Sequence, residues 1–263
     1  MSDRVRVSAG PAGVTVFELN APPANTYSYE MMRALDAAIL DARMDAEVHV
    51  IVIRGAGEKF FCAGADIGML QGADPGFKYN FCLHANETLL RLEQTPKLVI
   101  AAMNGHCVGG GLEVALGCDL RVGIEGGRGK VGLPEVNLGV LPGTGGTQRL
   151  SRALGKSKAI QMMIEGATMT VDEAAERGIV DKLLPAEGWW ERVLEYASSF
   201  CPPGKASKAV GLIKRAVQSG WELPLQSGLA LERELQQRLF TSEDATEGLA
   251  AYSEKRAANF TGR

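Results

Sequence analysis

A single glutamate stands in an otherwise apolar segment of the chain. The segment VGGGLEVALGCDLR spans residues 108–121, and its three consecutive glycines lead almost directly into Glu113. If a helix begins at Gly110 or Gly111, the neighbours of Glu113 at three and four positions are glycines and Leu116, and none is a cation. A carboxyl group buried in such surroundings has a raised pKa, which suits proton transfer near neutral pH. The alternative is a partly exposed first-turn glutamate that the helix dipole stabilises.

Two further stretches combine small residues with groups that could do chemistry. Bare N–H groups at a helix N-terminus, as in the glycine run, bind a carbonyl oxygen that becomes negatively charged. FFCAGADI at residues 60–67 also exposes backbone N–H groups, and its Asp66 would serve equally as a helix cap. VGLPEVNLGVLPG at residues 131–143 holds Glu135 in apolar company, although a glutamate after a proline is also typical of a helix start or turn. An acid or base beside such donors predicts proton transfer at an activated carbonyl.

Strand-like and helix-like segments alternate through the first two-thirds of the chain and must position these residues. Period-two patterns and short apolar runs predict strands at residues 14–19, 50–53, 98–103 and 119–124. Helical spacing predicts helices at residues 29–44, 77–93 and 112–117. Beyond about residue 190 only helices are expected, at residues 189–200, 205–219, 225–240 and 244–256. The pattern indicates an α/β core followed by a helical tail.

Composition and charge argue against several classes of protein. The 263 residues are 46% hydrophobic and 22% charged, which is ample for a sizeable core. The formal net charge of −3 provides no general attraction to nucleic acid or to an anionic membrane. No apolar run approaches the ~18–20 residues of a membrane span. The first residues, MSDRVRVSAG, lack the apolar region of a secretory signal, so a cytoplasmic protein is expected.

Several short motifs in the sequence resemble known sites but lack the required spacing or order. The five cysteines are scattered and the three histidines form no ligand cluster, so reduced thiols and no structural metal are expected. GHCVG at residues 105–109 has the shape of a hydrolase elbow with Cys107 as nucleophile, but no histidine follows His106 to complete it. LGKS at residues 154–157 lacks the first glycine of a P-loop. GTGG at residues 143–146 is more typical of a tight turn before a helix than of a dinucleotide site.

Four stretches together resemble the crotonase superfamily, and in particular its enoyl-CoA hydratases. They are FFCAGADI, NGHCVGGGLEVALGCDLR, LPEVNLGVLPGTGGTQRL and EDATEGLAAYSEKRAANF, in that order and at family-like spacing over most of the chain. The resemblance implies an α/β fold, a crotonase-like spiral of ββα units with a C-terminal all-helical segment. The catalytic core would span residues 1–195 and a helical oligomerisation segment residues 196–263. A homotrimer or homohexamer is implied, although the leucines of the 225–240 helix would suit an intramolecular core equally well.

The resemblance assigns roles to the residues singled out above. Backbone N–H groups of Ala65 and Gly110 would form an oxyanion hole for a thioester oxygen. Glu113 and Glu135 match the two catalytic carboxyls beside the enoyl double bond. The N–H of Gly143 would help to position water and the second carboxyl.

Contacts with coenzyme A are implied for Lys59, Ala63, Asp66, Ile67, Tyr252 and Lys255. In relatives, the residues matching Tyr252 and Lys255 often come from a neighbouring subunit. Surface lysines with no ligand are the alternative interpretation of Lys59 and Lys255. The chain departs from the family pattern at Gly68, where many relatives have a cation, and in the loop NAPPANTY at residues 20–27.

The implied activity is reversible hydration of a trans-2-enoyl-CoA. Coenzyme A is then part of the substrate, and neither a separate cofactor nor a nucleic acid or membrane partner is expected. Enoyl-CoA isomerases typically retain only the equivalent of Glu135, so Glu113 favours hydration. The alternatives are a Δ3,Δ2-enoyl-CoA isomerase, a pathway-specific 3-hydroxyacyl-CoA dehydratase and, more remotely, an RNA-binding or non-catalytic CoA-binding relative. The acyl group stays open, because the geometry of residues 69–80 and the following helix decides its size.

Overall fold

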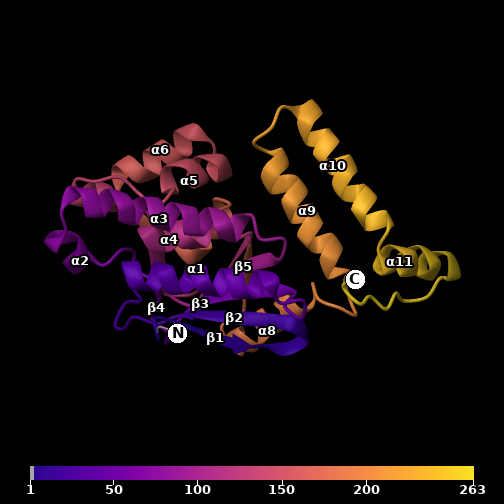
Figure 1. Cartoon of the computed structure of the whole chain (residues 1–263). Helices are drawn as coiled ribbons and strands as arrows, with labels where there is room; N and C mark the ends of the chain where they lie inside the picture. Colours follow the sequence, from indigo (N-terminus) through magenta and orange to yellow (C-terminus); the bar gives the residue numbers. More distant parts are fainter. Residues whose placement is uncertain (1–2) are drawn as a thin grey trace.

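The computed structural model of the chain describes residues 3–263 and is built on two sheets (Figure 1). The larger has six strands in the order β1-β2-β3-β5-β7-β10. Only the β1–β2 pair in this sheet is antiparallel. Its strands are β1 (Val5–Ala9), β2 (Val14–Leu19), β3 (Val50–Gly55), β5 (Leu98–Met103), β7 (Leu120–Ile124) and β10 (Lys182–Leu184).

The smaller sheet has strands of three residues each, in the order β4-β6-β8-β9. These strands are β4 (Phe60–Cys62), β6 (His106–Val108), β8 (Lys130–Gly132) and β9 (Thr168–Thr170). The strands come in successive pairs along the chain: β3–β4, β5–β6 and β7–β8. The first strand of each pair joins the larger sheet, the second joins the smaller sheet, and a helix follows. The chain therefore winds as a spiral of ββα turns, as the family resemblance implies.

Both faces of the larger sheet are covered, which explains its continuous apolar strands. On β3, Ile51 and Ile53 pack in a core cluster with α1 (Tyr29–Met44) and α3 (Pro75–Glu93). The alternating Val50 and Val52 pack on the other face against α8 (Trp189–Ser198). The remaining helices of the core are α2 (Ile67–Gly72), α4 (Gly110–Leu116), α5 (Gly146–Leu154), α6 (Lys156–Glu165) and α7 (Val171–Glu176), with 3-10 turns at η1 (Pro11–Gly13) and η2 (Glu135–Leu138).

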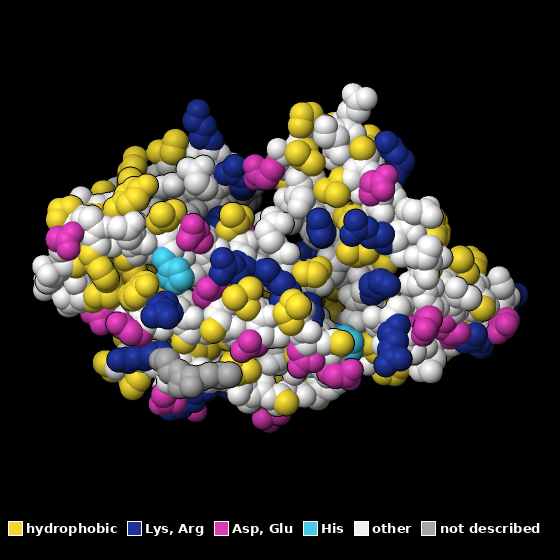
Figure 2. Space-filling model, viewed as in Figure 1, with side chains coloured by type: hydrophobic (Ala, Val, Ile, Leu, Met, Phe, Trp, Pro, Cys, Tyr) yellow, Lys and Arg dark blue, Asp and Glu magenta, His cyan; other side chains and the backbone are white. Residues whose placement is uncertain are grey.

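Three helices follow α8 in the chain: α9 (Ser207–Gly220), α10 (Leu225–Phe240) and α11 (Glu243–Glu254). Helix α9 contacts the core, where Nζ of its Lys214 donates to the Leu92 and Lys97 carbonyls, and α10 and α11 lie beyond α9 (Figure 1). The expected boundary between residues 195 and 196 lies inside α8, whose Trp189, Val193 and Ala197 belong to the core beneath the sheet. Helix α8 therefore spans the expected boundary and packs with the core. Figure 2 shows a cleft between the three helices that follow α8 and the helices α5 and α6. Within residues 3–263, no helix has the length and apolar character needed to cross a bilayer.

Candidate active site

Helix α4 begins in a turn that requires glycine. Gly109 has φ +57°, a left-handed conformation that side chains disfavour. A Cβ on Gly110 would lie 2.3 Å from the hydroxyl oxygen of Tyr27, so the phenol packs directly on the Gly110 backbone. The N–H of Gly110 donates to no acceptor within residues 3–263. It is one of the free donors that a helix N-terminus provides.

The segment after β4 supplies a second free donor beside the first. Ala65 forms a parallel bridge with Tyr27, in which the Tyr27 N–H donates to the Gly64 carbonyl at 2.9 Å and the Asp66 N–H donates to the Tyr27 carbonyl at 3.0 Å. The Ala65 N–H takes no part in this pairing and has no acceptor in the described part of the chain. A Cβ on Gly64 would lie 3.1 Å from the Gly110 nitrogen, so the two segments are in contact. Such a pair of donors suits an oxygen that gains negative charge.

Glu113 lies one turn into α4, with 2% of its surface exposed. Its Oε1 accepts hydrogen bonds from the N–H groups of Thr144 and Gly146, each at 2.7 Å. Burial raises the pKa of Glu113 to about 7; the bond from Gly146 opposes this rise, and the nearby charge of Glu135 adds to it. Oε2 accepts no hydrogen bond from residues 3–263. Glu113 is thus a carboxyl poised to exchange a proton near neutral pH.

Glu135 is the first residue of η2 and is half-buried. A Cβ on Gly109 would lie 3.2 Å from Oε1 of Glu135, so this carboxyl contacts the turn that precedes α4. Burial raises its pKa, and its buried Oε2 has no hydrogen-bond partner among the described residues. A carboxyl with so few donors favours its protonated form. Glu135 is therefore, like Glu113, a carboxyl able to hold a proton above its ordinary pKa range.

The loop before α5 holds Glu113 in place. Gly145 has φ +101° and caps α5, which confirms the predicted tight turn ahead of a helix. Among residues 3–263 the Gly143 N–H donates to neither carboxylate, and the Gly143 carbonyl accepts from Nδ2 of Asn86 at 3.0 Å. The donors to Glu113 are instead Thr144 and Gly146. These two donors could not be predicted from the sequence, because a backbone N–H carries no side-chain signal.

Comparison with known proteins places this arrangement in a family. A sequence model described as Enoyl-CoA hydratase/isomerase matches residues 9–263. The short-chain-enoyl-CoA hydratase of Clostridium acetobutylicum is 36% identical over 244 residues, which cover 92% of each chain. The 2,3-dehydroadipyl-CoA hydratase of Escherichia coli is 37% identical over 251 residues, 95% of this chain and 96% of that one. The chain belongs to the enoyl-CoA hydratase/isomerase family.

Structural similarity agrees with the sequence comparison. The crystal structure of an enoyl-CoA hydratase from Geobacillus kaustophilus matches with a TM-score of 0.96 and 45% identity, covering 100% of this chain and 98% of that chain. The predicted superfamily and the predicted crotonase fold of ββα turns are thereby confirmed.

The residues expected to contact coenzyme A fall into two separate groups in this member of the family. Lys59, just before β4, and Ile67, the first residue of α2, are exposed. Ala63 and Asp66 are half-buried beside the free donors. Asp66 also caps α2, accepting from the Met69 N–H at 3.0 Å. Tyr252 and Lys255 are exposed on and just after α11, at the opposite side of the molecule from α2 (Figure 1). One chain alone does not bring the two groups together.

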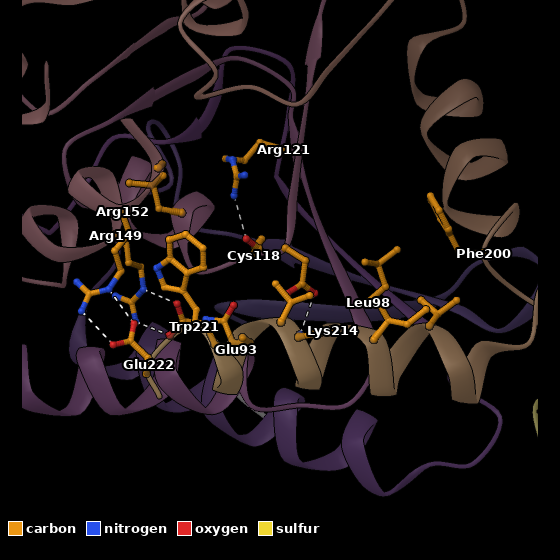
Figure 3. A pocket seen from close by; sticks show the side chains of 17 residues that line it. Glu93, Leu98, Cys118, Arg121, Arg149, Arg152, Phe200, Lys214, Trp221 and Glu222 are labelled. Atoms are coloured by element: carbon orange, nitrogen blue, oxygen red, sulfur yellow. Dashed lines mark hydrogen bonds and ion pairs between the residues drawn. The ribbon is translucent and has the colours of Figure 1, made fainter. Parts of the chain in front are cut away.

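A cavity of about 550 Å³ lies between α5 and α9, outside the candidate site (Figure 3). Neither catalytic candidate lines it, and three of its cations are paired with acids: Arg149 with Glu93, Arg152 with Glu222 and Lys214 with Asp119. Arg149 connects the cavity wall to the site, because its Nη1 donates to the Thr144 carbonyl at 3.0 Å. The cavity is therefore a neighbour of the site and not a part of it.

The structure does not favour a cysteine nucleophile. All five cysteines are free thiols, and burial raises the pKa of Cys107 well above its ordinary value, the opposite of what a nucleophilic thiolate requires. Within residues 3–263, no group of three or more His, Cys, Asp or Glu side chains could hold a metal ion. The site offers two carboxyls of raised pKa and two free backbone donors, which together support proton transfer beside a developing oxyanion.

Proposed function

We propose that the protein is an enoyl-CoA hydratase, which adds water reversibly across the 2,3 double bond of a trans-2-enoyl-CoA to give a 3-hydroxyacyl-CoA. The observation that carries the proposal is the meeting of Glu113 and Glu135 with two unengaged N–H groups, those of Ala65 and Gly110. The names of the relatives as hydratases support the same reaction class.

The free N–H groups of Ala65 and Gly110 would bind the thioester oxygen of the substrate. Water is a weak nucleophile and C3 of an enoyl thioester is only mildly electrophilic, so the reaction needs charge to be drawn onto that oxygen. Donors fixed in advance stabilise the enolate-like transition state, and loss of one such donor typically costs roughly 10²–10³ in rate.

Glu113 and Glu135 would divide the proton transfers. Ionised Glu113 accepts a proton from water as the water oxygen bonds to C3, and the π electrons of the double bond move into the thioester enolate. Protonated Glu135 then delivers its proton to C2 as the enolate collapses. The product carries OH at C3 and H at C2, and the two carboxyls have exchanged protonation states. The same steps in reverse dehydrate a 3-hydroxyacyl-CoA, so a dehydratase role uses the same site.

The presence of Glu113 favours hydration over isomerisation. A Δ3,Δ2-isomerase only moves a proton between C4 and C2 of the same substrate and needs no base for water. In this chain Oε1 of Glu113 is fixed by two N–H groups while Oε2 is left without a partner among residues 3–263, an arrangement suited to holding water.

Coenzyme A would bind at Lys59, Ala63, Asp66 and Ile67, and an oligomer would complete its site. Tyr252 and Lys255 lie across the molecule from α2, so their part in this proposal requires a neighbouring copy of the chain, as a homotrimer or homohexamer provides. The reaction requires no cofactor besides the coenzyme A of the substrate, and no step uses nucleic acid or a membrane. A cytoplasmic location belongs to the same proposal.

The proposal is tested with crotonyl-CoA, whose enoyl absorbance disappears on hydration. We expect the wild-type protein to remove it, and Glu113→Gln and Glu135→Gln each to lower kcat by roughly 10²–10⁴ with the fold intact. Glu125→Gln is the matched control, since Glu125 is exposed. A panel of enoyl-CoA and 3-hydroxyacyl-CoA substrates compared by kcat/KM then identifies the acyl group and the preferred direction.

Two results would overturn the proposal. Conjugation of a 3-enoyl-CoA without hydration of any 2-enoyl-CoA would make the protein an isomerase. Tight, salt-sensitive RNA retention in a filter-binding assay, with no turnover of any acyl-CoA, would make it a binding protein.

A further inference from the structure

The loop in which the sequence departs from the family pattern ends at Tyr27, and this side chain lies inside the candidate site. Tyr27 is 2% exposed, and its hydroxyl oxygen lies 2.8 Å from Oγ1 of Thr144. Its ring edge covers the Cα of Gly110, because a Cβ there would meet the phenol carbons at 2.5 and 2.7 Å. The phenol thus contacts one of the free-donor segments and the loop that holds Glu113.

The backbone of Tyr27 engages the other free donor. Its N–H and its carbonyl bond to Gly64 and Asp66, the two residues that flank Ala65. These two bonds fix the peptide planes on both sides of Ala65 and leave its own N–H without an acceptor among residues 3–263. Tyr27 therefore contacts both free-donor segments: its backbone is bonded on either side of Ala65, and its ring packs on Gly110.

Thr144 links the phenol to the catalytic carboxyl. The Thr144 N–H donates to Oε1 of Glu113 at 2.7 Å, while its hydroxyl pairs with Tyr27. Glu113 is also influenced by the charges of Glu135 and Arg149. Tyr27 is also influenced by the charges of Cys62 and Cys82. Of these, none donates a hydrogen bond to the Glu113 carboxylate. If Thr144 becomes more mobile, its N–H bond to Oε1 weakens, and ionised Glu113 loses part of its stabilisation.

We propose that Tyr27 is a positioning residue for the hydration reaction: its hydroxyl fixes Thr144, and through Thr144 the Glu113 carboxylate, while its backbone and ring set the spacing of the Ala65 and Gly110 donors. The inference rests on the proposed function for its kinetic consequence. Its structural consequence, the hold on Glu113, is independent of the substrate.

The test compares Tyr27→Phe and Thr144→Val, which each delete one partner of the hydroxyl pair and keep all backbone groups. With crotonyl-CoA we expect each variant to lower kcat about five- to tenfold with KM changed less than about twofold, the size of one lost hydrogen bond. The double variant is expected to be no slower than either single one, since both remove the same contact. Thr144→Ser retains a hydroxyl and is expected to keep near wild-type kcat. Tyr196→Phe, on α8 across the sheet, is the control.

A second readout uses no substrate. ¹³C-labelled glutamate, assigned by its loss in Glu113→Gln, reports the titration of Glu113, whose pKa is about 7 in the wild type. We expect this pKa to rise in Tyr27→Phe and Thr144→Val and to stay unchanged in Tyr196→Phe.

The two readouts separate the two proposals. A wild-type protein that hydrates no enoyl-CoA, but whose Glu113 titration moves in both variants, refutes the hydratase assignment and supports the hold of Tyr27 on Glu113. Wild-type kcat and an unmoved Glu113 titration in Tyr27→Phe would overturn the inference and leave Tyr27 a packing residue. If the fold-decrease in kcat of the double variant equals the product of the two single decreases, the two side chains act independently, and the inference is overturned as well.

Discussion

The backbone N–H of Gly146 donates to Oε1 of Glu113 at 2.7 Å, although the two residues stand 33 positions apart. Gly146 is the first residue of α5, so the carboxylate faces a helix N-terminus, where N–H groups are free and the dipole favours negative charge. This interaction opposes the effect of burial, and the pKa of Glu113 nevertheless stands at about 7. The two opposing effects leave the carboxyl balanced between its charged and neutral forms at neutral pH.

The first prediction concerns stability. Since the folded-state pKa of Glu113 lies above its ordinary value of 4.5, the folded protein binds this proton more tightly than the unfolded chain does. The stabilisation from the protonated carboxyl is therefore complete at low pH and is lost as pH rises from about 4.5 through about 7. Glu113→Gln stays neutral and keeps an acceptor for both N–H groups. We expect its free energy of unfolding at pH 8 to exceed that of the wild type by up to about 3 kcal/mol.

Urea unfolding of both proteins at about pH 5 and pH 8 checks this. The difference between them should shrink strongly at the lower pH, where wild-type Glu113 is protonated. Glu125→Gln, at an exposed position, should match the wild type at both values. A Glu113→Gln protein no more stable than the wild type at pH 8 would show that the wild-type carboxylate is well solvated.

The second prediction concerns the pH dependence of activity. Glu113 must be ionised to accept a proton from water, so kcat/KM with crotonyl-CoA should rise with pH up to about 7. Glu135 must be protonated, and burial raises its pKa too, so activity should fall again at higher pH. Because the two carboxyls interact, the limbs report the pair and not each residue separately. A profile that is flat between pH 5.5 and pH 8 would contradict these roles.

The long elements could be predicted from the sequence because their patterns repeat. The apolar runs of β3 and β5 indicated strands buried on both faces, and α1, β2, β5 and α10 have the expected bounds. The strands of the smaller sheet could not be predicted, since three residues show no periodicity and their pairing is set by the spiral of the chain. No strand is therefore predicted at Phe60–Cys62 from the sequence.

The candidate site was predictable only where side chains carry the signal. Glu113 stood out as a lone carboxyl in an apolar helix, and burial does raise its pKa as expected. The groups that hold it are the N–H groups of Thr144, in the loop before α5, and of Gly146, the first residue of α5. They lie more than thirty positions away, and a backbone N–H does not depend on the side chain, so the sequence gives no sign of them. A role for Tyr27 could not be predicted from the sequence, because its contacts with Gly110 and Thr144 arise from the tertiary fold.

The third prediction concerns the close approach at Gly110. A Cβ there would lie 2.3 Å from the Tyr27 hydroxyl, so Gly110→Ala must displace either the phenol or the start of α4. Either shift separates the two free donors, and we expect kcat to fall by roughly 10². Gly220→Ala is the control, since a Cβ at Gly220 would meet nothing closer than 4.0 Å. Unchanged kcat in Gly110→Ala would mean that the Gly110 N–H does not bind the reacting oxygen.

The fourth prediction separates stability from positioning at Arg149. Its Nε and Nη2 each lie 2.7 Å from a Glu93 oxygen, and its Nη1 donates to the Thr144 carbonyl. The side chains are 14% and 11% exposed, so Arg149→Met leaves Glu93 charged, buried and without this cation. We expect a loss of about 3 kcal/mol in the free energy of unfolding, and a lower kcat because Thr144 is released.

The double variant Arg149→Met/Glu93→Leu removes both charges, and we expect it to recover most of the lost stability. Its kcat should stay low, because the Thr144 carbonyl still lacks the guanidinium donor and the N–H on Glu113 is still loosened. Arg152→Met is the comparison: its ion pair with Glu222 is about half-exposed and should contribute less than about 1 kcal/mol. Urea unfolding and kcat with crotonyl-CoA measure the two effects on the same samples. Recovery of kcat together with stability in the double variant would show that Arg149 supports the site only by keeping the protein folded.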